Sequence, residues 1–239
     1  MSGASDNILE ISGLNTSYGR IPMLRDVGLV IPKGQVCCVL GANGAGKTTL
    51  VKAILNMIKA DKGAMSLDGE KIDAWPTHKR VERGIALSAS AVGTFHKMTV
   101  DANLRMGAYY INNEKLLSER LSEIYKSFPV LRLRLNQKAG TLSGGERTML
   151  AIARAVVNHP KLLILDEPSL GLAPIMVEAV FDIIRSLRAK RMSILLVEQN
   201  SVKALSVATT GYVIQKGAIV FSGSAAALSD SEYVENPVM

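Results

Sequence analysis

The sequence predicts an α/β fold built around a mostly parallel sheet. Three short apolar runs, Val36–Leu40, Leu162–Leu165 and Ile194–Val197, lack the alternation of half-exposed strands. Continuous apolar runs of this length are typical of parallel strands that are buried on both faces. Segments with helical periodicity separate these runs, and strands that alternate with helices form a sheet with helices on both sides.

The N-terminal part predicts an antiparallel β subdomain. Ile8–Leu14 and Asp26–Ile31 alternate as strands do. Ala64–Leu67 and Lys71–Ile72 flank the dipeptide Asp68-Gly69. Because Asp-Gly favours the tight turn of a hairpin, these two segments are expected to pair.

The middle of the chain predicts an inserted helical subdomain over about residues 89–159. Val100–Tyr110 and Glu114–Ser127 carry helical periodicity, and Ser143–Val157 is an amphipathic helix that begins after a Ser-Gly-Gly turn. The remaining expected elements are helices over Lys47–Ile58, Met176–Arg188 and from Val202, and a last hairpin with strands Tyr212–Gln215 and Ile219–Phe221. No repeat or linker interrupts residues 1–239, so we expect one domain with subdomains.

Composition favours a soluble protein. Of the 239 residues 48% are hydrophobic, which is enough for a substantial core, and no apolar run approaches the roughly 20 residues of a membrane helix. The N-terminus lacks the layout of a secretory signal. The net charge of +7 comes from dispersed basic residues, which fit either a solvated surface or attraction to an anionic membrane surface. We expect contact with a membrane only from the side.

The two cysteines, Cys37 and Cys38, are neighbours in a predicted strand. Adjacent strand residues point to opposite faces, so these thiols pair poorly with each other. Two cysteines make neither a disulfide framework nor a metal cluster. They are expected to be small core residues of a protein in a reducing compartment.

A glycine-rich loop follows the first buried strand and matches G-x-x-x-x-G-K-[ST]. Its residues are Gly41, Ala42, Asn43, Gly44, Ala45, Gly46, Lys47, Thr48 and Thr49. Glycines let backbone N–H groups approach the phosphates of a nucleotide, and the helix that begins near Lys47 adds its positive end. Lys47 is expected to bridge the β- and γ-phosphates, and the Thr48 hydroxyl to hold Mg²⁺. The position between strand and helix disfavours the alternative, an ordinary glycine-rich turn.

Two acids follow the strand Leu162–Leu165, at the carboxyl end where ligands of α/β proteins bind. Asp166 is expected to bind Mg²⁺ through water, and Glu167 to polarise the attacking water as general base. Such a strand end is a weak signal alone, but a strong one after a phosphate loop.

The segment Leu142–Glu146 reads Leu-Ser-Gly-Gly-Glu. Together with the phosphate loop and the acidic strand end, it resembles the signature of ATP-binding cassette (ABC) proteins over essentially the whole chain. The resemblance implies an ATPase in which two such chains close around ATP and Mg²⁺. In that family the signature loop of one subunit contacts the γ-phosphate held by the other. Ser143 and the backbone of Gly144 and Gly145 match those contacts, and Glu146 completes the ATP-binding set.

Three further positions follow from this resemblance. Tyr18 stands where an aromatic stacks on adenine, although a tyrosine taken alone is more often a core or surface residue. Gln199 replaces the histidine that contacts the γ-phosphate in most members, and its amide donates a hydrogen bond without a charge. Ser90 falls where a Gln or Glu senses Mg²⁺ and water, and it is too short to reach without a bridging water. We therefore hypothesise that this chain's own ATP site is slow, while Ser143–Glu146 serves the partner's site.

Three segments resemble those of the smaller, LivF-type ATPase of branched-chain amino acid importers. They are Asp166–Pro174, Val197–Asn200 and Leu142–Met149. This resemblance implies a second ABC ATPase subunit (in a heterodimer, or a homodimer), two membrane permease subunits and, indirectly, a periplasmic substrate-binding protein, but no nucleic acid. It implies a peripheral location on the cytoplasmic face of the inner membrane. One alternative is a weakly hydrolysing structural partner, and another is a non-transport ABC ATPase. The latter usually needs a coiled coil or a second cassette, for which 239 residues leave no room.

The loop Ala91-Val92-Gly93, with Phe95 and Met98, is small and apolar. We expect it to form a groove for a coupling helix of a membrane subunit. Ordinary packing of the helical subdomain is the alternative.

Overall fold

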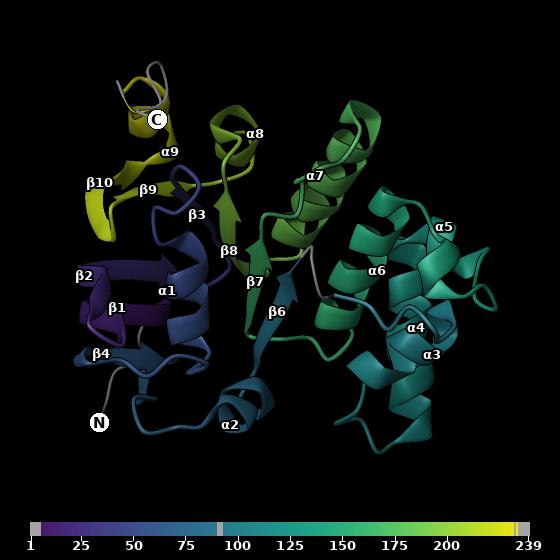
Figure 1. Ribbon diagram of the computed structural model, residues 1–239. Coiled ribbons are helices and arrows are strands. Elements are labelled where there is room, and N and C mark those ends of the chain that lie inside the picture. The colour runs from purple at the N-terminus through teal and green to yellow at the C-terminus, as the bar shows by residue number, and fades with distance from the viewer. Residues whose placement is uncertain (1–5, 90–92, 232, 234–239) are drawn as a thin grey trace.

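The computed structural model describes residues 6–89, 93–231 and 233. A six-stranded sheet occupies the middle of the molecule, with an antiparallel sheet on one side and the helical subdomain on the other (Figure 1). The predicted α/β class with an N-terminal antiparallel part and an inserted helical part is confirmed.

The central sheet has the order β10-β9-β3-β8-β7-β6. Its strands are β3 (Val36–Leu40), β6 (Ile85–Ala89), β7 (Leu162–Asp166), β8 (Ser193–Glu198), β9 (Thr210–Gln215) and β10 (Ala218–Ser224). All pair in parallel except β10, which returns antiparallel to β9 through the predicted last hairpin. Every residue of β3 and β8 is buried, which explains the apolar runs Val36–Leu40 and Ile194–Val197.

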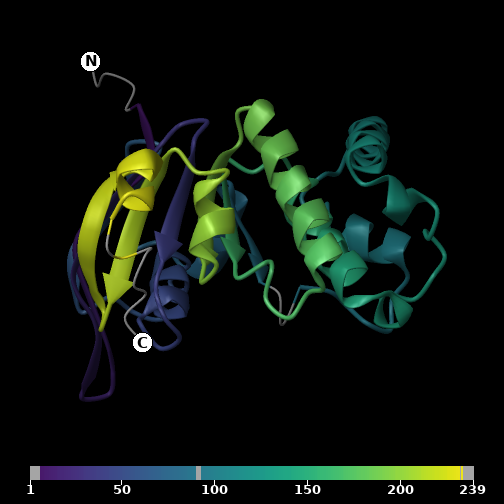
Figure 2. The same ribbon diagram turned by 90° about the horizontal axis from the view of Figure 1, so that it is seen from above.

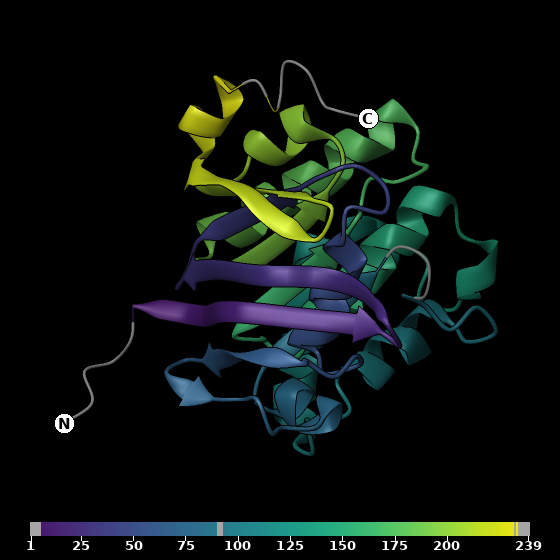
Figure 3. The same cartoon turned by 60° about the vertical axis from the view of Figure 1, so that its left-hand side comes forward.

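The second sheet has the order β2-β1-β4-β5 and lies in front in Figure 3. Its strands are β1 (Asn7–Tyr18), β2 (Ile21–Pro32), β4 (Lys62–Leu67) and β5 (Glu70–Lys71). β1 pairs antiparallel with β2 and with β4. Both β1 and β2 are longer than the alternating segments Ile8–Leu14 and Asp26–Ile31 that predicted them. At the predicted hairpin turn Asp68 and Gly69 have φ of 53° and 80°, the left-handed conformation that this turn requires.

Some of the helices form the helical subdomain, and others cover the central sheet. They are α1 (Lys47–Ile54), α2 (Thr77–Glu82), α3 (Val100–Gly107), α4 (Glu114–Ser127), α5 (Pro129–Arg132), the 3₁₀ turn η1 (Ala139–Thr141), α6 (Gly144–Val156), α7 (Pro174–Ala189), α8 (Ser201–Leu205) and α9 (Ala225–Ser229). Seen from above, α7 lies between the sheets and helices α3 to α6 (Figure 2). No helix within the described residues has the length and apolar character needed to cross a membrane.

α1 ends at Ile54, four residues before the predicted end. Asn56 has a φ of 54°, which breaks the helix. The buried guanidinium of Arg80 takes up the carbonyls of Ala53 and Ile54 at the helix end, with Nη1–O distances of 3.2 and 2.7 Å. A contact from a distant helix therefore sets this boundary.

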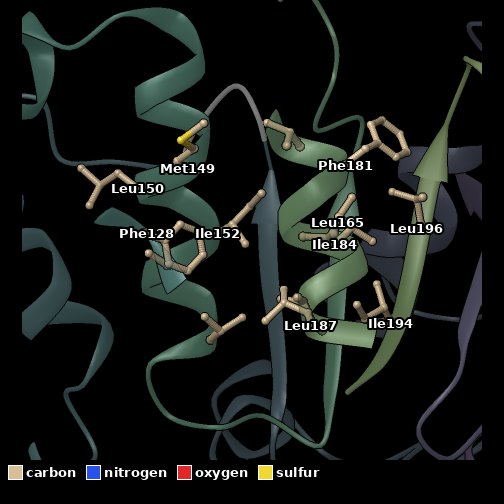
Figure 4. Close-up of a cluster of buried hydrophobic side chains, with 14 of the residues drawn as sticks. Phe128, Met149, Leu150, Ile152, Leu165, Phe181, Ile184, Leu187, Ile194 and Leu196 are labelled. Carbon is tan, nitrogen blue, oxygen red and sulfur yellow. The ribbon is translucent and has the colours of Figure 1, made fainter. Parts of the chain in front are cut away.

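The core consists of two hydrophobic clusters on the two faces of the central sheet. Figure 4 shows one of these clusters. In it Phe181 of α7 packs over Leu196 of β8, and Met149 of α6 belongs to the same cluster. The other cluster joins the sheet to α1 and the antiparallel sheet.

The prediction that both cysteines are core residues is confirmed. Cys38 lies in the first cluster and Cys37 in the second, so adjacent thiols face opposite sides of the sheet. Both are free and fully buried. Burial raises the pKa of Cys37 to about 11 and that of Cys38 to about 12, which keeps both as neutral thiols.

Candidate functional site

Three neighbouring strands bring the predicted catalytic residues to one edge of the central sheet. β3 ends at Leu40, directly before the phosphate loop, and Leu40 lies opposite Glu198 of β8. β7 ends at Asp166, opposite Val197 of β8. Because these strands are parallel, their carboxyl ends meet at the same edge, where α/β proteins bind ligands.

The phosphate loop needs glycine at three points. Gly44 and Gly46 have φ of 78° and 114°, a region that other residues rarely adopt. At Gly41 a Cβ atom would lie 2.5 Å from the carbonyl oxygen of Ile214. The N–H of Gly217, in the turn between β9 and β10, donates to the carbonyl of Ala45 at 2.8 Å. The last hairpin thus braces the loop from behind.

Lys47 lies inside this loop and is only 4% exposed. Its Nζ donates to the carbonyls of Gly41 at 2.8 Å and Ala42 at 3.0 Å. Nζ also lies 3.1 Å from Oε1 of Glu167. The loop cation and the predicted general base therefore occupy one site, and the three ammonium donors can exchange these partners for phosphate oxygens.

Asp166 has the properties of a cation ligand. Its Oδ1 is buried and has no hydrogen-bond partner among the described residues. Burial and, secondly, the charge of Glu167 raise the pKa of Asp166, while Lys47 and a hydrogen bond from Thr48 act in the opposite direction. A carboxylate oxygen without a partner beside a hydroxyl fits Mg²⁺, which binds through one or two protein oxygens and takes its other ligands from water and phosphate. No cluster of three or more His, Cys, Asp or Glu suited to a metal occurs in residues 6–89, 93–231 and 233.

We predict that Asp166→Asn stabilises the protein at neutral pH in the absence of nucleotide and Mg²⁺. Because the pKa of Asp166 is raised, the folded state binds its proton more tightly than the unfolded state, and stability is lost as the pH rises through the raised pKa. Removing the charge should raise the thermal midpoint by about a degree or two in EDTA. The gain should disappear when the pH is lowered far enough to protonate Asp166 in both states. A lower midpoint at neutral pH would contradict this account, and Mg²⁺-dependent ATP binding should weaken in the same variant.

The signature segment forms the N-terminal end of α6. Ser143 is the N-cap: its Oγ accepts from the N–H of Glu146 at 3.2 Å, and Glu146 Oε2 accepts from the N–H of Ser143 at 2.9 Å. Arg134 Nη2 holds the other carboxylate oxygen of Glu146 at 2.9 Å. These contacts fix the helix end with its N–H groups directed outward, which favours an anion.

The signature and the phosphate loop belong to different parts of the fold. α6 lies in the helical subdomain, and β7 and β8 separate it from α1 (Figure 1). One chain brings Lys47, Asp166, Glu167 and Gln199 to the same edge of the sheet, whereas Ser143 to Glu146 are presented elsewhere. This division leaves the signature segment available to another chain.

The remaining predicted residues have separate environments. Tyr18 ends β1 and is 45% exposed, so its ring is accessible for stacking. Gln199 is exposed directly after β8. Ser90, together with Ala91 and Val92, lies outside the described residues.

Sequence reasoning missed Glu198. This residue ends β8 and is only 2% exposed. The sequence contained a signal for it, because an acid directly ends a strand that is expected to be buried. Acidic side chains are almost never fully buried unless they have partners, so such an acid is expected to bind specific groups.

Comparison with known proteins gives the class. The model of the ABC transporter family matches residues 24–170. The high-affinity branched-chain amino acid transport ATP-binding protein BraG of Pseudomonas aeruginosa is 39% identical over 221 residues, which cover 92% of this chain and 94% of BraG. A probable branched-chain amino acid transport ATP-binding protein, LivF of Archaeoglobus fulgidus, is 39% identical over 227 residues, 95% of this chain and 96% of the relative.

Solved structures agree with this class. The ADP conformation of MJ1267, an ATP-binding cassette of an ABC transporter, superposes with a TM-score of 0.86 at 28% identity and covers 97% of this chain and 98% of that one. The fold and the phosphate loop thus define an ATP-binding cassette with ATPase activity. The chain belongs to the ABC transporter family.

Proposed function

We propose that this chain is the ATP-hydrolysing subunit of an ABC importer for branched-chain amino acids or related amino acids and amides. The observation that carries the proposal is the 39% identity, over nearly the full length of both chains, to two ATP-binding proteins of branched-chain amino acid transport. The site at the ends of β3, β7 and β8 supplies the groups that such an activity needs.

In the proposed site the loop amides and Lys47 bind the β- and γ-phosphates of ATP. Glu167 accepts the proton of the attacking water, and the 3.1 Å distance between its carboxylate and Lys47 Nζ supports its assignment to the same site. Thr48 and Asp166 would hold Mg²⁺, which neutralises phosphate charge when bound.

Three further predicted groups complete the proposed nucleotide contacts. The Gln199 amide donates to the γ-phosphate, and Tyr18 stacks on adenine. Ser143 to Glu146 would contact ATP held by a second ATPase subunit, so hydrolysis requires two chains.

The proposed permease partners need a docking surface at the helical subdomain. A cavity of about 520 Å³ opens between α2, β6, α3 and α6. Its wall includes the exposed apolar side chains of Met57, Val81, Met106, Tyr109 and Tyr110. An apolar cytoplasmic helix of a permease fits such a groove, and this contact would hold the ATPase at the cytoplasmic face of the membrane.

The neighbouring segment is packed from within the chain. Arg154 of α6 donates through Nη1 to the carbonyl of Gly93, and its guanidinium lies 4.6 Å from the ring centroid of Phe95. These contacts support the alternative of ordinary packing for Gly93 and Phe95. The docking proposal therefore rests on the cavity wall.

Reconstitution tests the proposed function. The chain would be placed in proteoliposomes together with a second ATPase subunit, two permease subunits and a binding protein of a branched-chain amino acid importer. We expect uptake of labelled leucine, isoleucine or valine that depends on ATP and is abolished by Lys47→Ala. ATP hydrolysis that responds to neither the binding protein nor amino acids would contradict the transport assignment. Single-turnover hydrolysis by this chain distinguishes the alternative of a weakly hydrolysing structural partner.

A further inference from the structure

Glu198 is a buried carboxylate in the middle of the active-site edge. β8 lies between β3, which leads into the phosphate loop, and β7, which leads to the predicted general base. The side chain is 2% exposed. Burial of an ionised carboxylate is strongly unfavourable unless hydrogen bonds replace its water.

Backbone N–H groups from two loops supply these hydrogen bonds. The N–H of Ser169 donates to Oε1 of Glu198 at 3.0 Å. The N–H groups of Gln199 and Asn200 donate to Oε2 at 3.0 and 3.5 Å. Backbone amides of two separate loops thus satisfy the charge of Glu198.

Each of these loops carries a residue of the proposed mechanism. Glu167 lies two residues before Ser169, and Gln199 directly follows Glu198. A cavity of about 340 Å³ opens between the loops, and Glu167, Glu198 and Gln199 all line it. The carboxylate therefore lies between the proposed general base and the proposed γ-phosphate contact.

The backbone of Glu167 needs such support. Its φ of 49° is left-handed, a conformation that a residue with a side chain keeps only when its surroundings impose it. The N–H of Glu167 donates to the carbonyl of Val197 at 2.9 Å, and the N–H of Leu170 donates to the carbonyl of Glu167 at 3.2 Å. The Ser169–Glu198 bond closes this turn onto β8.

We propose that Glu198 is a positioning residue for ATP hydrolysis: its carboxylate ties the loop after Glu167 to the loop that carries Gln199, so that base and phosphate contact move as one unit. The inference rests on the proposed function for the roles of these two residues. The tie itself is a property of the hydrogen bonds and is measured separately.

Glu198→Gln tests the tie in the full-length protein assembled with its partner ATPase. The amide keeps the shape of the side chain, but its NH₂ group faces N–H donors, so one loop loses its acceptor. We expect kcat for ATP to fall about 10- to 100-fold while KM stays near the wild-type value, because misplacement of the base affects the transition state rather than ATP binding. Hydrogen exchange should accelerate in residues 169–172 and 199–201 together.

Two further variants make the test decisive. Glu198→Asp keeps the charge on a shorter side chain, so kcat should lie between the wild-type and Gln values, and it replaces the Gln variant if that protein does not fold. Ser193→Ala is the matched control: Ser193 is buried at the opposite end of β8, where its Oγ accepts from the N–H of Gly34 at 2.9 Å. It should lower the thermal midpoint and leave kcat unchanged.

Wild-type kcat in a folded Glu198 variant would overturn the proposal. Faster exchange in one loop alone would overturn it as well, as would a loss of kcat no larger than in Ser193→Ala. The outcome for the proposed function is separate: if Glu167→Gln retains full activity, the assigned base is wrong, whereas the exchange of the two loops still reports whether Glu198 connects them.

Discussion

Glu167→Gln should reduce ATP hydrolysis at the site on this chain's own phosphate loop by about 10²- to 10⁴-fold, the usual contribution of a general base. Glutamine has the size of glutamate, but its amide does not accept the proton of the attacking water. Lys47 loses a partner 3.1 Å away and keeps the carbonyls of Gly41 and Ala42, so ATP binding should persist. Single-turnover hydrolysis and equilibrium binding of a fluorescent ATP analogue measure the two effects.

Glu178→Gln provides the control. Glu178 of α7 is about half exposed and pairs with Lys203 outside the proposed site. Loss of this surface charge should leave hydrolysis unchanged, because exposed ion pairs contribute little. Equal activity in Glu167→Gln and Glu178→Gln would contradict the assignment of the base.

The same variant tests the asymmetric hypothesis that Ser90 and Gln199 suggest. If the site on this chain is slow, transport by the complete importer should fall less with Glu167→Gln here than with the matching change in the second ATPase. Equal losses would show that both sites contribute equally. Gln199 is described by the structure and is exposed beside Glu198, whereas the role of Ser90 stays a sequence-based prediction.

Arg80→Leu should destabilise the protein by about 3–5 kcal/mol, as removal of a buried charged group with many partners usually does. The guanidinium is fully buried. Besides the carbonyls of Ala53 and Ile54, it donates to those of Ile72 and Asp73 at 2.8 and 3.3 Å and to that of Trp75 at 3.0 Å. Leucine leaves these oxygens without a donor, and the end of α1 without its cap.

For a chain of this size the loss corresponds to a fall in the thermal midpoint of about 6–20 °C. Calorimetry or circular dichroism measures it directly. Lys79→Met, one residue earlier, removes a cation 4.8 Å from the Trp75 ring centroid and should cost about 1 kcal/mol or less. A midpoint of Arg80→Leu equal to that of Lys79→Met would contradict the clamp. Because α1 begins at Lys47, we also expect weaker ATP binding in Arg80→Leu.

Local patterns predicted elements whose interactions lie within or beside them. β3 has the predicted bounds because an apolar run of 5 residues between a turn and a glycine-rich loop has the length of a buried strand and is too short for a typical helix. α4 has the predicted bounds because its amphipathic period and the Asn113 cap are both local. α2 was not predicted: its six residues are too few for a helical period.

The binding site shows the same division. The sequence by itself determined the phosphate loop, its glycines and the acidic end of β7, because the spacing of neighbouring residues produces each of them. Only the tertiary structure decided that Lys47 meets Glu167, that Asp166 keeps a buried oxygen without a partner in the described chain, and that Glu198 holds two loops. These contacts join residues far apart in the chain, and they arise from the order β3-β8-β7, which long-range packing selects.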